Sequence, residues 1–174
     1  MTITKIWAES LKVKSDKILS PIPGYSKLYA RSAREIATRT LILQGIVAVA
    51  CNVDAQPSVG WYQDQEIWEA VTPRERAFLL SAESTEAQRI HFQWKQEAEW
   101  TLLWMIGKVE SLGLPNHQCD TRRLVDEIIP ALGSNVFDFV GRAQLRSPGA
   151  LLAEDDRIYD LWCYALAEIG RAHV

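Results

Sequence analysis

Apolar residues recur along most of this chain every three or four positions, which is the period of an amphipathic α-helix. Two of the runs are long and span residues 32–51 and 85–107, and residues 52–60 are predicted to be a loop. Shorter runs cover residues 3–19, 62–71, 73–82, 121–129, 134–142 and 147–169, the last with a break near Asp155. Residues 46–50 would also suit a strand, but no partner strand or hairpin dipeptide is apparent. The pattern predicts an all-α fold.

Local signals mark where several of these helices begin. Ser32 and Glu35 have the spacing of a capping box, and Thr72 and Glu75 repeat it. Asp120 stands where an N-cap is expected, directly before the run that starts at residue 121. These residues set the predicted starts of three helices.

The run over residues 85–107 is predicted to be the centre of the fold. It carries Trp94, Trp100 and Trp104, and residues 98–106 are apolar on nearly every side. A helix that is apolar all round is a buried one. At 174 residues the chain is long enough to bury a sizeable core. We therefore expect one globular domain over residues 1–174, built around this buried helix.

The composition is that of a soluble globular protein, with 48% hydrophobic and 24% charged residues. A net charge of −3 and scattered lysines and arginines give no electrostatic reason to expect nucleic acid as a partner. No apolar run reaches the roughly 20 residues that cross a bilayer, and the N-terminus lacks the apolar core of a signal peptide. The three cysteines form no CxxC pair. We expect a cytoplasmic protein without a membrane segment, metal or cofactor.

Polar side chains lie among the tryptophans of the predicted central helix. Steps of three and four place four residues on one helix face, namely Trp94, Glu97, Thr101 and Trp104. A carboxylate on that face needs a partner, because burying an unpaired charge is costly. The predicted partner is Arg39, which lies on the apolar side of the earlier long helix and whose guanidinium can bind a carboxylate through two hydrogen bonds.

Two interpretations of Glu97 and Arg39 stay open. They are either a buried ion pair that sets the register of two core helices, or the polar groups of a pocket floored by tryptophans. Tryptophans at this spacing are more often core residues. A stacking platform for nucleic acid would also need a basic rim, which Arg89 and Lys95 alone do not supply.

His117 and Cys119 share one loop directly before Asp120, which raises metal binding or a Cys/His nucleophile as alternatives. No second cluster at zinc-finger spacing supports a metal site, and a lone cysteine near a histidine is weak evidence for catalysis. Asp120 is better explained as a helix cap. The acidic residues 154–156 suit a solvated helix start. No phosphate-binding loop, HExxH or GxSxG motif is present.

Several segments resemble one known family: RSAREIATRTLILQGIVAVA, TPRERAFLL, HFQWKQEAEWTLLWMIGKVESLGLPNHQCD and RSPGALLAEDDRIYDLWCYAL. Together they are similar to the DUF4272 family of bacterial proteins over about residues 31–165, and the string W-x-x-E-A…L-L-W…L-P…C-D is the most specific part. The family is a domain of unknown function. The resemblance therefore implies a fold and a bacterial source, and no reaction.

The sequence favours a non-catalytic protein that binds a protein partner, without excluding an enzyme. One form would be a bacterial immunity or antitoxin-like protein that neutralises its partner. The alternative is an enzyme or small-ligand binder whose Trp-lined pocket includes Glu97 and Arg39. The residues predicted for that pocket, or for a buried polar network, are Arg39, Trp94, Glu97, Thr101, Trp104 and Asp120. A closed core would favour the first function, and an open cavity that reaches Glu97 the second.

Overall fold

The computed structural model describes residues 31–172, with side-chain surroundings up to residue 166. Every regular element in this part is a helix, which confirms the all-α fold. The elements are α2 (Ala33–Ala50), α3 (Ala55–Asp64), the 3₁₀ turn η2 (Trp68–Ala70), α4 (Pro73–Leu79), α5 (Glu86–Gln93), α6 (Lys95–Met105), α7 (Thr121–Arg123), the π-helical turn η3 (Leu124–Ile128), α8 (Phe137–Gly141) and α9 (Pro148–Ala172). The helix predicted over residues 3–19 lies outside the described residues.

Residues 31–145 form one compact unit, and α9 belongs to a second unit. The expectation of a single domain over residues 1–174 stays a prediction. α9 is continuous, so the break predicted near Asp155 is wrong. Glu154 and Arg157 form an ion pair one turn apart across that point, which favours the helical conformation there. None of the described helices is long and apolar enough to cross a membrane.

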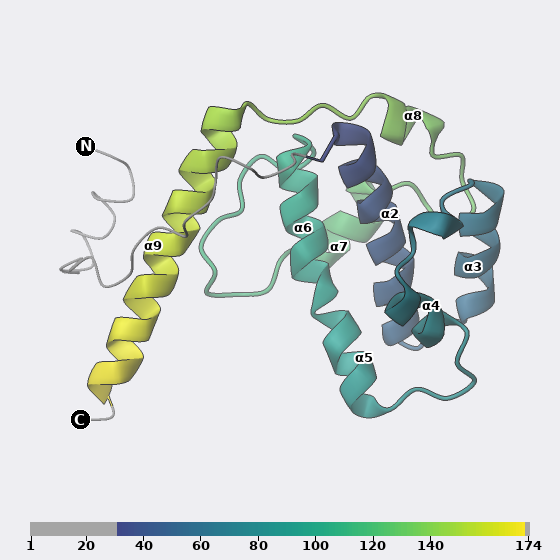
Figure 1. Ribbon diagram of the computed structural model, residues 1–174, viewed down its shortest axis with the longest axis horizontal. Helices are drawn as coiled ribbons and strands as arrows, with labels where there is room; N and C mark the ends of the chain where they lie inside the picture. The colour runs from purple at the N-terminus through teal and green to yellow at the C-terminus, as the bar shows by residue number, and fades with distance from the viewer. Residues whose placement is uncertain (1–30, 173–174) are drawn as a thin grey trace. The chain divides into compact units, whose positions relative to one another are not determined.

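The larger unit is built on α2. Figure 1 shows α2 between α6 and α3, and α4, α5, α8 and η2 also pack on it. Its start is the predicted capping box, in which Ser32 and Glu35 bind each other's backbone N–H groups. Buried residues lie on most sides of the helix and include Ile36, Ala37, Leu41, Ile42, Leu43, Ile46 and Ala50. A helix that is apolar on most sides must be enclosed by others. That central place therefore belongs to α2.

The prediction of one helix over residues 85–107 is wrong. α5 ends and α6 begins at Trp94, where φ is −63° and ψ is −13°. The N–H of Glu97 donates to the carbonyl of Trp94 at 3.3 Å, a three-residue bond that tightens the turn as in a 3₁₀-helix. Phe92 before the break and Leu103 after it are both buried, and they stay in phase as on one helix. Apolar periodicity alone therefore does not reveal the break.

The other start signals are confirmed, and one predicted loop is wrong. Thr72 and Glu75 form the second capping box, and the carboxylate of Asp120 accepts a hydrogen bond from the N–H of Arg123. The loop predicted over residues 52–60 is mostly helix, because α3 already begins at Ala55 behind the N-cap Asp54. Proline in the first turn of a helix gives up no intrahelical hydrogen bond, so Pro57 does not prevent this start.

Gly45 allows α3 to approach α2 closely. The hydroxyl of Tyr62 on α3 donates to the carbonyl of Ile42 at 2.7 Å. A Cβ at position 45 would overlap that hydroxyl oxygen and lie 2.8 Å from the Tyr62 Cζ atom. We expect Gly45→Ala to lower the free energy of unfolding by about 1–3 kcal/mol, because overpacking would displace the Tyr62 ring. Urea denaturation checks this, and the substitution Gly60→Ala at a half-buried position of α3 is the matched control, since nothing lies within 4 Å of a Cβ there.

Candidate functional site

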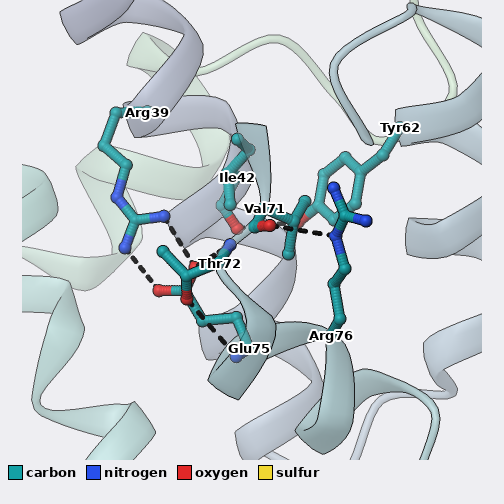
Figure 2. A network of polar contacts seen from close by, with 7 residues as sticks. All are labelled: Arg39, Ile42, Tyr62, Val71, Thr72, Glu75 and Arg76. Carbon is teal, nitrogen blue, oxygen red and sulfur yellow. Dashed lines mark hydrogen bonds and ion pairs between the residues drawn. The ribbon is translucent and has the colours of Figure 1, made fainter. Parts of the chain in front are cut away.

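Arg39 of α2 and Glu75 of α4 form a bidentate ion pair, which Figure 2 shows together with the capping box of α4. Nη1 of Arg39 donates to Oε2 of Glu75 at 2.8 Å, and Nη2 donates to Oε1. Oε2 also accepts from the backbone N–H of Thr72 at 3.1 Å. One carboxylate therefore caps α4 and binds α4 to α2.

The balance of interactions favours the ionised form of Glu75. Burial alone would raise the pKa of this carboxyl, but hydrogen bonds from Arg39 and Thr72 and the charge of Arg39 outweigh it and lower the pKa. The predicted pairing of Arg39 with Glu97 is wrong, because both terminal nitrogens of Arg39 bind Glu75. The sequence pattern predicts Glu75 only as a capping residue.

Glu97 instead holds the loop that precedes α7. Its Oε1 accepts a hydrogen bond from the backbone N–H of Cys119 at 2.9 Å. The neighbouring Gln96 donates from Nε2 to the Cys119 sulfur at 3.2 Å and to the Thr121 hydroxyl at 2.6 Å. Burial, followed by the nearby charge of Glu97, raises the pKa of the Cys119 thiol to about 11. A thiol held protonated at neutral pH is a poor nucleophile.

The remaining predicted site residues are spread over the surface and the core. Trp94 is 60% exposed, and the Thr101 side chain is exposed and donates to the carbonyl of Glu97 at 2.9 Å. Trp104 is buried. Asp120 caps α7, as predicted. The structure thus places these residues in separate contacts rather than around one shared pocket.

The fully buried carboxyl of α6 is Glu99, two residues after the predicted one. Its exposed fraction is 0%, and neither oxygen has a hydrogen-bond partner among the described residues. Burial raises the pKa of Glu99 well above its usual range, which favours the neutral form. A signal was present in the sequence, because Glu99 stands seven residues after Phe92 and four before Leu103 on one helix face.

A groove of about 540 Å³ opens elsewhere on the larger unit, between α2, the end of α3 and the start of α8. Its buried floor is apolar and consists of Ile67, Val136 and Val140. Its exposed rim carries Arg34, Asp64, Glu66 and Phe137. Phe137 is 73% exposed, the largest exposed fraction of any large hydrophobic residue in the described part. None of the six site residues predicted from the sequence lines this groove.

The groove is held by hydrogen bonds between its walls. The side-chain Oε1 of Gln65 accepts from the N–H of Val136 at 3.2 Å, and the indole of Trp61 donates to the carbonyl of Ser134 at 2.7 Å. These bonds fasten the end of α3 to the segment before α8. The rim is therefore organised in advance of any binding, which lowers the entropic cost of binding.

Glu66 adopts a backbone conformation that usually belongs to glycine. Its φ is +57°, and the bonds from Ile67 N–H to the carbonyl of Tyr62 (2.9 Å) and from Glu66 N–H to that of Gln63 (3.1 Å) form a Schellman motif. α2 and α6 end in the same motif with Asn52 and Gly107, which suit a positive φ. Glutamate there costs on the order of 1 kcal/mol, and such strain is typical of functional sites.

The family model that matches this chain is DUF4272, a domain of unknown function, and it covers residues 3–171. The chain belongs to the DUF4272 family. The match is longer than the resemblance over residues 31–165 that the sequence motifs indicate. No curated protein and no solved structure matches the chain.

In this DUF4272 protein the described residues include no group of three or more His, Cys, Asp or Glu side chains that could hold a metal ion. His117 contacts the carbonyl of Gln118 through Nδ1 at 2.9 Å, and the Cys119 sulfur is engaged by Gln96. The acid–base and thiol groups of the predicted site thus serve local structure. The charged rim groups of the groove, by contrast, form no ion pair with another described residue.

Proposed function

We propose that the protein acts by binding a partner protein, a segment of which lies in the groove between α2, α3 and α8. The observation that carries this proposal is Phe137, a phenylalanine 73% exposed on the rim of a groove whose buried floor is apolar. Exposed aromatic residues beside a concave apolar floor are typical of the anchoring points of protein interfaces. The strained Glu66 supports the proposal, since its side chain is held at the rim at a local cost.

The charges of the rim indicate the chemistry of that segment. Arg34, Asp64 and Glu66 have no ion-pair partner in the described part of the chain. Two carboxylates against one guanidinium make the rim acidic. The fitting segment therefore carries an apolar side chain for Phe137 and a lysine or arginine for Asp64 and Glu66.

Several contacts support a non-catalytic role. Arg39 is bound to Glu75, Glu97 holds the backbone of Cys119, and the raised pKa of Cys119 disfavours the thiolate. The groups on which the alternative of an enzyme or Trp-lined ligand pocket depends are thus separated. Neutralisation of a toxin, which the sequence analysis suggests, would be one specific form of partner binding.

Two variants test the groove. Phe137→Ser removes the anchor, and we expect the partner to bind about 30-fold more weakly, as for loss of an interface hot spot worth about 2 kcal/mol. Glu66→Gly removes a rim charge while relieving the positive φ, so it should weaken binding without lowering the free energy of unfolding. A partner captured from cells by the wild-type chain, then identified and purified, supplies the ligand for titration calorimetry.

The matched control is Val53→Ser. Val53 is also an exposed apolar residue, but it precedes the start of α3, and the groove lies at the other end of that ten-residue helix, roughly 15 Å away. It should bind the partner as the wild type does. Equal affinity of the purified partner for wild type and Phe137→Ser would contradict the proposal. For a toxin partner, co-expression of the wild type and not of Phe137→Ser should restore growth.

A further inference from the structure

A second exposed surface lies where α5 meets α6, away from the residues that line the groove. We define the Trp94 surface by its five residues, Arg74, Ile90, His91, Trp94 and Lys95. Ile90 and Trp94 are exposed and stand four residues apart, and the N–H of Trp94 donates to the carbonyl of Ile90 at 3.2 Å. Two large apolar side chains are thus presented side by side to solvent.

Basic side chains gather next to this apolar pair. Arg74 on α4 and Lys95 at the start of α6 both act on His91, since burial and then these two positive charges lower the pKa of its imidazole. Their effect places Arg74 and Lys95 near His91, and the lowered pKa keeps that imidazole neutral at pH 7, so that the two positive charges are those of Arg74 and Lys95. Neither Arg74 nor Lys95 has an ion pair with a described carboxylate. The surface is therefore locally cationic in a chain of net charge −3.

Buried aromatic rings fix this surface from below. The rings of Phe78 on α4 and Phe92 on α5 are 4.2 Å apart between centroids. The guanidinium of Arg74 lies 5.9 Å over the Phe92 ring, and the His91 ring packs edge-on to Phe92 at 5.1 Å. α4 and α5 are thus held together by Phe92, and the side chains of Arg74 and His91 rest on its ring. Such preorganisation lowers the entropic cost of binding.

The chemistry of the surface selects the partner. Tryptophan and arginine are enriched at the centres of protein interfaces. The two positive charges of Arg74 and Lys95 would neutralise only about two phosphates, whereas backbone binding of nucleic acid gains its affinity from many such contacts. Carboxylates of a protein segment complement this charge, and an apolar residue beside them would cover Ile90 and Trp94.

We propose that the Trp94 surface binds an acidic segment of a protein, with Asp or Glu side chains on Arg74 and Lys95 and an apolar side chain across Ile90 and Trp94. The two surfaces thus have opposite charge. The groove takes a basic segment, and the Trp94 surface takes an acidic one. The second proposal does not depend on the first, since it rests on different residues.

Selection of random dodecapeptides on the full chain tests this proposal. We expect selected peptides to be enriched in Asp and Glu next to a large apolar residue. They should bind the variant Trp94→Ser at least tenfold more weakly than the wild type. Arg74→Glu combined with Lys95→Glu should weaken the same peptides at least tenfold. Arg122→Glu, a reversal at an arginine side chain that is 91% exposed on α7, is the matched control and should leave them bound.

The same peptides separate the two surfaces. Peptides that are lost on Phe137→Ser and kept on Trp94→Ser belong to the groove and bear only on the proposed function. The inference is overturned if no selected peptide depends on Trp94, or if those that do carry no excess of Asp and Glu. Binding of a twelve-residue oligothymidylate that is lost on Trp94→Ser would assign the surface to nucleic acid and would also overturn it.

Discussion

Arg39→Met should lower the free energy of unfolding by about 3–5 kcal/mol at pH 7, because it leaves the carboxylate of Glu75 buried without its counterion. The Glu75 side chain is only 5% exposed, so water replaces the lost hydrogen bonds poorly. The double variant Arg39→Met with Glu75→Leu should recover much of the loss, because an apolar pair needs no compensation. It should still lack the capping box of α4, which is worth roughly 1 kcal/mol.

The destabilisation caused by Arg39→Met should depend on pH. The pKa of Glu75 is lower in the folded state than in the unfolded one, so its contribution is present above the unfolded value of 4.5 and is lost as the pH falls through the folded value. The deficit of Arg39→Met should therefore shrink in acid. Urea denaturation between pH 3 and pH 7 measures it.

Glu97→Gln is the control that separates the observed ion pair from the one predicted by the sequence. Its amide oxygen can still accept the hydrogen bond from the N–H of Cys119, so we expect a change of less than about 1 kcal/mol. Near-wild-type stability of Arg39→Met, or a loss in Glu97→Gln as large as in Arg39→Met, would contradict the pairing of Arg39 with Glu75.

Glu99→Met should make the protein more stable, by about 1–3 kcal/mol at neutral pH. Both carboxyl oxygens of Glu99 are buried and have no hydrogen-bond partner among the described residues, and replacing such a group by an apolar one of similar size removes its desolvation cost. The gain should grow with pH. Because the pKa of Glu99 is raised in the folded state, its contribution falls as the pH rises from the unfolded value of 4.5 towards the folded one.

The slope of this loss is at most about 1.4 kcal/mol per pH unit for one proton. Glu99→Gln isolates it, because glutamine keeps the size and the unpaired polar atoms and cannot ionise. We expect Glu99→Gln to lose the slope and Glu99→Met to lose both the slope and the desolvation cost. Urea denaturation from pH 5 to pH 9 compares the three proteins. If Glu99→Met were less stable than the wild type at every pH tested, the carboxyl would have to make a stabilising hydrogen bond in the core, which would contradict this prediction.

Short-range signals predicted the helix starts correctly. Ser32 with Glu35, Thr72 with Glu75, and Asp120 all cap the helices assigned to them, because a cap binds backbone N–H groups two or three residues away. The all-α fold was predictable for a similar reason, since helical periodicity is a local property. The break at Trp94 was not, because both halves keep their buried residues in phase.

Long-range pairing was not predictable from these patterns. The apolar pattern correctly predicts that Arg39 lies on the inner side of its helix, but the predicted partner Glu97 is wrong, since Glu75 binds Arg39. Glu75 already had an assigned role as a cap, but a carboxylate has enough acceptor positions to bind Thr72 and Arg39 together. Glu97 and Glu99 are two residues apart on α6. Which of them is buried depends on which side of α6 faces α2.

By itself the sequence determined the helical class, the capped helix starts and the position of Arg39 on the inner side of its helix. With the family match it also determined membership in DUF4272. These follow from local spacing and from sequence likeness. Only the tertiary structure decided the partner of Arg39, the orphan carboxyl of Glu99 and the groove with Phe137 on its rim. The groove joins residues 34–38, 64–70 and 135–140. Its strained residue is Glu66, and because this residue is not a glycine, the sequence does not reveal the positive φ. Such features depend on how separate segments pack, which local patterns do not encode.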